Sequence, residues 1–319
     1  MKILVIKLGA LGDLINSTAI IKQITEHHKN SSITILTSPA FTELLTSFKN
    51  VKIKAFSRKG LFNTFKTIVW LRTEKFDRIY DLQSNDRTTI LCALSGAPYR
   101  AGNHPRFPYH AHPKNPYIGE CHSFERLNQI IESAGIKRAK PLPFLPVPDK
   151  TKAEISQWLS RHNLIEKSFA ILHAGSSPLH IKKRWPYFSA LASALSETMK
   201  VVWVGGKDDV ELNSILSKNT GIDATNAFSI LGLVELGKHA KFAVTNDSAP
   251  MHILSCSQIP VFGLFGPTYP RRTHALGQFE NVITPDNLIA QNDQGFVPKD
   301  ISDITLDAVL TKLKDQSLI

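Results

Sequence analysis

Apolar runs and amphipathic segments alternate along the first half of the chain. Short apolar runs are separated by stretches whose apolar residues recur at every third or fourth position, which predicts strands alternating with helices. Strands alternating with helices are typical of a parallel sheet covered on both faces. The predicted strands are 2–7, 33–37, 51–56, 77–82 and 98–101, and the predicted helices are 13–28, 40–48, 61–73, 86–95 and 122–135.

A proline-rich segment interrupts this pattern. Residues 137–150, KRAKPLPFLPVPDK, hold four prolines within eight residues, which neither a helix nor a central strand tolerates. The alternation then restarts, with strands at 168–173, 199–204, 241–244 and 260–265 and helices at 151–163, 185–197, 208–218, 233–239, from Pro250 and at 303–316. We therefore predict an α/β protein with two Rossmann-like, doubly wound parallel-sheet domains facing a cleft. The predicted domains are 1–145 and 146–302, and a C-terminal helix in 303–319 is expected to pack back toward the first domain.

The composition is that of a folded protein. Of 319 residues, 42% are hydrophobic and 20% are charged, which excludes a disordered chain. Cys92, Cys121 and Cys256 lie far apart, which excludes a disulfide framework or a cysteine zinc site and fits a reducing cytoplasm. The apolar run at the start of the chain is interrupted at Lys7 and Gly9, whereas a signal peptide needs an unbroken apolar segment. We therefore expect a strand and a loop there rather than a signal peptide. No apolar run approaches the roughly 20 residues of a membrane-spanning helix.

The net charge of +11 is unevenly distributed. Between positions 49 and 75 the only acidic residue is Glu74, against the basic residues Lys49, Lys52, Lys54, Arg58, Lys59, Lys66, Arg72 and Lys75. Such a stretch attracts a nucleic acid, a membrane surface or an acidic substrate, or it is the solvated face of a basic protein. The chain lacks the usual nucleic-acid-binding motifs, so we expect no nucleic-acid partner.

The loop after the first predicted strand, KLGALGD at 7–13, is a candidate site. Gly9 and Gly12 permit a tight turn and the close approach of another molecule to the backbone. Their spacing differs from the G-x-G-x-x-G of dinucleotide-binding proteins, so no nicotinamide cofactor is expected. Asp13 either takes a proton from a hydroxyl group or caps the following helix, and the spacing does not decide between these roles.

Small, donor-rich loops follow the predicted strands of the second half. Glycine-rich turns and helix N-termini hold phosphate, and ligands of parallel sheets bind at the carboxyl ends of the strands. The cations of KKRWP at 182–186 suit a leaving diphosphate, although three basic residues are often a solvated turn. Asp208 is explained about equally well as a helix cap. An N-cap is also the alternative for Asp247, whose place beside a predicted phosphate loop modestly favours a functional role. We predict a site for a phosphate-bearing ligand on the loops HAGSS at 173–177, VGGKDD at 204–209, TNDSAPMH at 245–252 and GLFGPT at 263–268.

Residues 102–121 show no periodicity, and a loop of this length within a compact domain is usually functional. The loop holds His104, His110 and His112, with no carboxylate or thiol at ligand spacing. We therefore expect contact with solvent or substrate in preference to a metal site.

Seven segments of the chain, taken in order, resemble the bacterial heptosyltransferases of glycosyltransferase family 9, which add heptose to the lipopolysaccharide inner core. The resemblance covers nearly the whole chain, in the order and spacing of the family. One departure is Ala249-Pro250, where many relatives have glycine. The segments are KLGALGD at 7–13, DLQSNDRTTILCALSGA at 81–97, SFERLNQIIESAGI at 123–136, HAGSS at 173–177, KKRWP at 182–186, TNDSAPMH at 245–252 and GLFGPT at 263–268.

The resemblance implies a GT-B fold, with the acceptor on the first domain and a nucleotide sugar on the second. It implies inverting transfer from ADP-heptose without a metal or cofactor, with Asp13 as general base and Lys183 at the donor phosphates. The donor contacts expected are Ser176, Ser177, Gly205, Gly206, Asp209, Asp247, Ser248, Ala249, His252, Gly266, Pro267 and Thr268. The acceptor contacts expected are Gly9, Gly12, Arg58, Lys59, Gln83 and Arg126.

The resemblance also implies partners and a location. We expect an ADP-sugar donor, an acidic lipopolysaccharide-core acceptor and a monomeric cytoplasmic enzyme that the basic stretch 49–75 holds at the inner face of the inner membrane. Two alternatives stay open. One is a GT-B transferase or epimerase that uses a different nucleotide sugar, and the other is a non-catalytic module that binds anionic glycolipid through residues 49–75.

Overall fold

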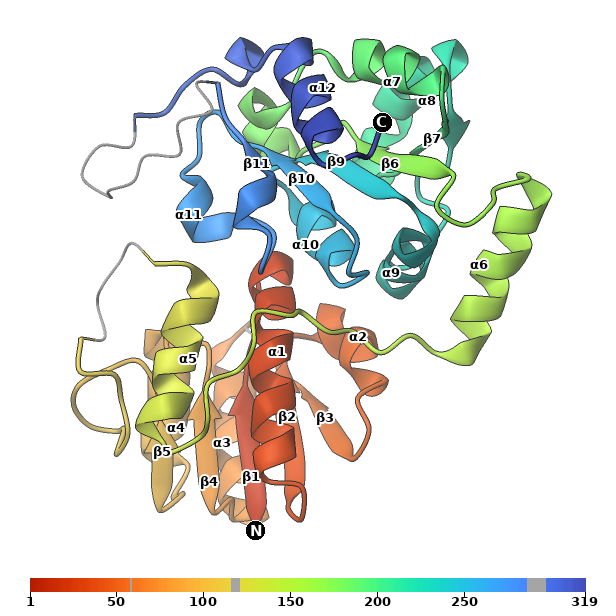
Figure 1. Cartoon of the computed structure of the whole chain (residues 1–319). Coiled ribbons are helices and arrows are strands. Elements are labelled where there is room, and N and C mark those ends of the chain that lie inside the picture. The colour runs from red at the N-terminus through yellow and green to blue at the C-terminus, as the bar shows by residue number, and fades with distance from the viewer. Residues whose placement is uncertain (58, 116–120, 286–296) are drawn as a thin grey trace. The chain divides into compact units, whose positions relative to one another are not determined.

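The computed structural model describes residues 1–57, 59–115, 121–285 and 297–319, which form two compact units (Figure 1). The units are Met1–Pro146 and Val147–Ile319, so the division falls within the proline-rich segment. Each unit is a parallel sheet with helices on both faces, which confirms the predicted fold class.

The first unit is built on a five-stranded sheet in the order β3-β2-β1-β4-β5. Every pairing is parallel, and Ile3 of the central strand β1 lies opposite Ile33 of β2 and Arg78 of β4. The apolar residues of β1 are fully buried because helices cover both faces of the sheet. The strands are β1 (Lys2–Ile6), β2 (Ser32–Thr37), β3 (Val51–Ala55), β4 (Arg78–Asp81) and β5 (Tyr99–Ala101).

Helices α1 and α5 pack together on one face of this sheet, and α3 and α4 cover the other (Figure 1). Leu71 of α3 and Leu91 of α4 are buried against Leu4 and Ile6 of β1. The helix bounds match the apolar periodicity to within a few residues, with α1 (Leu11–His27), α2 (Thr42–Thr46), α3 (Leu61–Glu74), α4 (Asp86–Leu94) and α5 (Ser123–Ser133).

The second unit has a six-stranded parallel sheet in the order β11-β10-β9-β6-β7-β8. The two edge strands β8 and β11 have two residues each, too few for a period to be seen in the sequence, and we did not predict them. The strands are β6 (Phe169–His173), β7 (Lys200–Trp203), β8 (Ile222–Asp223), β9 (Phe242–Asn246), β10 (Val261–Leu264) and β11 (Val282–Ile283).

Helices of the second unit share two apolar cores, one on each face of the sheet. The C-terminal helix α12, which we expected to pack toward the first domain, lies in the second unit, where Val309 and Leu313 are buried with residues of α7. Helix α7 begins at Phe188 rather than at Trp185. The helices are α6 (Asp149–Arg161), α7 (Phe188–Ser196), α8 (Val210–Asn219), α9 (Ile230–His239), α10 (Ala249–Ser255), α11 (Pro270–Thr273) and α12 (Leu306–Asp315).

Each sheet has one point at which the strand order reverses. In the first sheet the chain moves from β1 to β2 and β3 and then returns to β4 on the other side of β1. In the second sheet it moves from β6 to β7 and β8 and then returns to β9 on the other side of β6. Ligands of such sheets bind where the loops diverge, at the carboxyl ends of the two adjacent strands. The candidate loops at 7–13 and 173–177 follow β1 and β6, at these two points.

Candidate active site

Lys183, Asp247 and Thr268 form a polar cluster at the carboxyl end of the second sheet. One oxygen of the Asp247 carboxylate accepts a hydrogen bond from Lys183 Nζ at 2.6 Å and another from Thr268 Oγ1 at 2.7 Å. The Asp247 side chain is 7% exposed and that of Lys183 is 20% exposed. All three residues were predicted donor contacts, and they are brought together although they lie up to 85 positions apart in the chain.

Asp209 lies in a second, more buried group that joins three loops. Its Oδ2 accepts a hydrogen bond from the backbone N–H of Gly206 at 2.9 Å and lies 3.5 Å from His173 Nε2, while Oδ1 lies 4.0 Å from Arg184 Nη2. The other ring nitrogen of His173 is 3.2 Å from Ser248 Oγ. Burial alone raises the pKa of Asp209, but the hydrogen bonds from His173 and Gly206 and the charge of Arg184 outweigh burial and lower it.

The loop after β6 is compact because Gly175 has no side chain. A Cβ atom at this position would overlap the Asp209 carboxylate. Ser176 is buried in the same loop, where its hydroxyl donates to the carbonyl of His180 at 3.0 Å and accepts from Arg184 Nε at 3.3 Å. His173 and Arg184 were not among the predicted site residues, although both belong to segments that we singled out.

Asn246, the last residue of β9, is a second buried residue that fixes this loop. Its amide nitrogen donates to the carbonyls of Ala174 and Gly175 at 2.9 and 3.0 Å, and its Oδ1 accepts from Trp185 N at 3.1 Å. The bond holds the backbone of Trp185 at the end of β9, three residues before α7 begins. A polar residue two positions after the predicted apolar strand 241–244 was the only sequence signal for this role.

The other predicted donor residues occupy the same edge of the sheet with different exposure. Ser177, Gly206 and Pro267 are accessible to solvent, whereas His252 is buried in α10 and Gly205 packs against Asp209. Ser248 and Ala249 are the N-cap and first residue of α10, so their backbone is at a helix N-terminus. At Gly266 a Cβ atom would lie 2.6 Å from the backbone of Ile301.

Asp13 is exposed at the carboxyl end of the first sheet. It lies in the first turn of α1, whose N-cap residue is Ala10. Asp13 is therefore not the N-cap of this helix, which was one of the two roles that the sequence allowed. No hydrogen bond or ion pair joins its carboxylate to the rest of the described chain. An exposed carboxylate at the end of β1 has the accessibility that a general base needs.

A buried cation, Lys7, lies beneath this carboxylate. Lys7 is 6% exposed, and its Nζ donates to the carbonyl of Leu82 at 3.4 Å. Burial lowers the pKa of Lys7, the charges of Asp13 and Asp81 oppose that shift, and Arg126 adds to it. Asp13 and the predicted acceptor residue Arg126 are therefore within electrostatic reach of the same ammonium group. Sequence reasoning did not single out Lys7 for a role.

Gln83 links the loops after β1 and β4. Its side-chain carbonyl accepts from the backbone N–H of Leu8 at 3.0 Å, and its own N–H is held by the fully buried Asp81 at 3.0 Å. Burial raises the pKa of Asp81, partly offset by its hydrogen bonds from Ser84 and Tyr109.

Position 9 requires a glycine, for two reasons. It has a φ of +114°, and a Cβ atom there would lie 2.5 Å from the ring of Phe41. Gly12 lies in the first turn of α1, and Lys59 and Arg126 are exposed. Arg58, the remaining predicted acceptor contact, lies outside the described residues.

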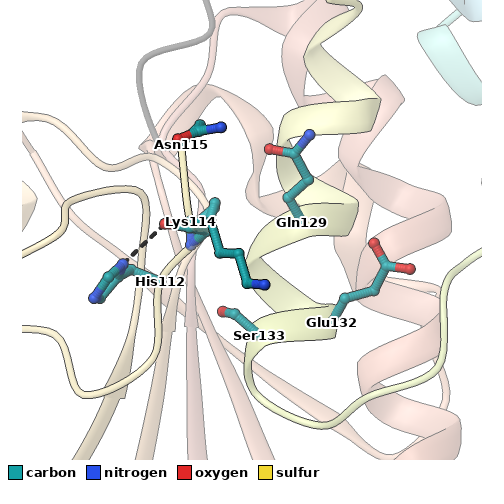
Figure 2. Close-up of a pocket in the computed structure, with 7 residues that line it drawn as sticks. His112, Lys114, Asn115, Gln129, Glu132 and Ser133 are labelled. Carbon is teal, nitrogen blue, oxygen red and sulfur yellow. Dashed lines mark hydrogen bonds between the residues drawn. The ribbon is translucent and has the colours of Figure 1, made fainter.

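A separate hollow of about 490 Å³ lies between α5 and the segment 112–115 (Figure 2). Lys114, Gln129 and Ser133 border it, and His112 Nδ1 lies 2.9 Å from the carbonyl of Pro113. None of the predicted site residues lines this hollow. Within the residues that the structure describes, no three His, Cys, Asp or Glu side chains gather so that they could hold a metal ion.

The sequence matches the family model for glycosyltransferase family 9 (heptosyltransferase) over residues 65–295, which is most of the chain. The protein belongs to this family. This chain is 23% identical to a lipopolysaccharide core heptosyltransferase, OpsX, of Haemophilus influenzae. The match covers 99% of this chain and 91% of that protein.

Solved structures of family 9 members have the same fold. A family 9 glycosyltransferase from Veillonella parvula superposes with a TM-score of 0.81 at 21% identity, over 98% of this chain and 96% of the other. The Escherichia coli structure described as ADP-heptose LPS heptosyltransferase II gives a TM-score of 0.76 at 20% identity, over 99% and 98%. The two parallel-sheet units are therefore those of a GT-B glycosyltransferase. None of the helices in the described part of this family 9 chain is long and apolar enough to cross a membrane.

Proposed function

We propose that this protein is an inverting glycosyltransferase that moves heptose from ADP-heptose to an acceptor in the lipopolysaccharide inner core. The observation that carries the proposal is the family 9 match over residues 65–295, which includes the loop after β4 and the strand-end loops of the second unit. The acceptor class is the one named for the Haemophilus influenzae relative, and the donor is the one named for Escherichia coli heptosyltransferase II.

In the proposed reaction Asp13 accepts the proton of the attacking acceptor hydroxyl. The acceptor oxygen then forms a bond to the anomeric carbon while the bond from that carbon to the diphosphate breaks, with its electron pair going to ADP. Attack opposite the leaving group inverts the anomeric centre. The exposure of Asp13 and its place at the carboxyl end of β1 support this role.

Lys183 is the proposed partner of the leaving diphosphate. An ammonium group held in a partly buried position stabilises the negative charge that develops as ADP departs. Its 2.6 Å contact with Asp247 fixes the position of the cation, and Asp247 is proposed to contact the sugar of the donor. No metal is proposed to take part, so the chelator EDTA is expected to leave turnover unchanged.

The test is Asp13→Asn in an assay of ADP release from ADP-heptose with a heptose-deficient lipopolysaccharide acceptor. The variant is expected to lose about 10²–10⁴-fold in kcat, as is typical when a general base is removed, with its ADP affinity unchanged. Asp86→Asn is the matched control because Asp86 is also an exposed aspartate in the first turn of a helix of the same unit.

Equal activity of Asp13→Asn and the wild type would contradict the assignment of the base. Calorimetry with ADP, UDP and GDP tests the donor separately. Tight binding of only UDP or GDP would exclude ADP-heptose, epimerisation without an acceptor would favour the epimerase, and glycolipid binding without turnover would favour the binding module.

A further inference from the structure

Helices α3 and α4 expose an apolar surface that the proposed reaction does not use. We call this surface, Phe62, Phe65 and Val69 of α3 with Ile90 and Leu94 of α4, the α3–α4 face. Phe62 and Phe65 are 67% and 62% exposed, and the three aliphatic residues are between 42% and 50% exposed. Scattered exposed apolar residues are normal, but five on two neighbouring helices form a patch.

The five side chains are on one surface because of the helical spacing. Phe62, Phe65 and Val69 follow one another at three and four positions, so they form a single row along α3. The opposite side of α3 carries Thr67 and Leu71, which are buried toward the sheet. The guanidinium of Arg72 donates to the carbonyl of Leu94 at 2.9 Å, so the C-terminal ends of the two neighbouring helices are in contact.

Cations surround this row. Lys66 Nζ lies 4.6 Å from the centre of the Phe62 ring, and Arg72 and Lys59 are exposed at the two ends of α3. Glu74, the only acidic residue between positions 49 and 75, lies 3.4 Å from Lys2 Nζ and is thereby partly neutralised. The α3 side of the face is therefore apolar with basic residues beside it, while the first turn of α4 carries one exposed acid, Asp86, next to Arg87.

We propose that the α3–α4 face docks on an anionic lipid bilayer. Aromatic and aliphatic side chains of an interfacial helix enter the boundary between head groups and acyl chains, while neighbouring lysines and arginines meet the lipid phosphates. A nucleic acid would be attracted to the same cations but offers no apolar phase for Val69, Ile90 and Leu94. A second copy of the chain would bring the same positive charges together, which is unfavourable.

The orientation of α3 and α4 suits a lipid-borne acceptor. Both helices begin at the carboxyl edge of the first sheet, where Asp13 lies, so a sugar attached to a lipid in the same bilayer reaches that edge. This consequence rests on the proposed function, whereas the docking itself does not.

The experiment is co-sedimentation of the full chain with vesicles of phosphatidylcholine, with and without phosphatidylglycerol. We expect binding only to the anionic vesicles and weaker binding at high salt. The double variant Phe62→Ser with Phe65→Ser is expected to bind at least about tenfold more weakly. Lys66→Gln is expected to lose about fivefold, since one cation near an anionic surface contributes about that factor.

Matched variants test whether vesicle binding depends on the α3–α4 face itself or on the general charge and hydrophobicity of the protein. Phe107→Ser, at a phenylalanine that is 72% exposed elsewhere in the unit, and Lys29→Gln, at another exposed lysine, are expected to bind like the wild type. If the double variant does not fold, the proposal is tested by comparing the vesicle binding of Lys66→Gln with that of Lys29→Gln.

Three results would overturn the proposal. The first is no binding to anionic vesicles, and the second is equal loss in the face variants and their controls. The third is a sedimentation-velocity dimer, or an RNA complex, that the Phe62 and Phe65 substitutions abolish while vesicle binding persists. ADP binding is measured in parallel, and its loss would count against the proposed function without bearing on docking.

Discussion

Asp209 connects three loops of the second unit through one buried carboxylate. The residues that contact it come from the end of β6, the loop after β7 and the segment before α7. Because the hydrogen bonds and the positive charge of Arg184 lower its pKa despite burial, the ionised form stabilises the folded protein. Asp209 thus positions the loops that carry Ser176 and Ser248, and its predicted contact with the donor stays a prediction.

The first prediction concerns the pH dependence of this residue. The folded-state pKa of Asp209 is below the unfolded value of about 3.9, so its contribution is complete above that pH and is lost as the pH falls through the folded pKa. Asp209→Asn is expected to lower the free energy of unfolding by about 1–3 kcal/mol at pH 7. The difference from wild type is expected to shrink below about pH 4, measured by urea unfolding at several pH values.

The neighbouring Asp208→Asn is the control, because Asp208 is exposed in the same turn. It is expected to leave the unfolding free energy unchanged across the pH range. A difference between Asp209→Asn and wild type that stays constant from neutral to acidic pH would show that charge is not the source of the stabilisation.

At the scale of elements, the loops after β6 and β7 approach so closely that glycines line their contact. Gly175 faces the Asp209 carboxylate, whereas a Cβ at Gly206 would meet nothing within 4 Å. Gly206 has a φ of −94°, which any residue adopts. The two glycines therefore offer a matched pair on adjacent strand-end loops.

We predict that Gly175→Ala destabilises the protein by about 1–3 kcal/mol, because the methyl group displaces Asp209 from its partners. We also predict weaker ADP binding by this variant, since the displaced loops carry the proposed donor contacts. Gly206→Ala is expected to change the free energy of unfolding by less than about 0.5 kcal/mol. Urea unfolding and calorimetry measure the two effects, and equal free energies of unfolding for the two alanine variants would refute the steric argument.

At the scale of the whole molecule, each unit has its own sheet and its own buried core. Multidomain chains of this kind unfold in more than one transition. Leu91→Ala removes a fully buried side chain in the first unit, which costs about 2–5 kcal/mol and is expected to lower only the transition of that unit. ADP in large excess is expected to raise only the other transition.

Differential scanning calorimetry measures both effects. Ile165→Ala, at a residue that is 74% exposed in the second unit, is the control and is expected to move neither transition. If ADP raised the transition that Leu91→Ala lowers, the assignment of the donor to the second unit would be wrong.

Most of the fold could be predicted from the sequence, because strands buried on both faces are continuous apolar runs and their helices have a regular period. The sequence also predicted which residues lie at strand ends, among them Gly9, Asp13, Ser176 and Asp247. This was possible because the carboxyl ends of all strands of a parallel sheet lie at the same edge. The two-residue strands β8 and β11 did not follow, because only pairing with a neighbouring strand defines them, and α7 starts three residues later than its apolar period predicts.

The sequence by itself thus determined which loops carry chemical groups and at which edge of a sheet they lie. Only the tertiary structure decided which polar side chains turn inward, because Asp209, Asn246 and Lys183 each have partners that lie 25 to 72 positions away along the chain. Local spacing has no information about such distant pairs. Strand order brings them within hydrogen-bonding distance, and burial then makes leaving them unpaired costly.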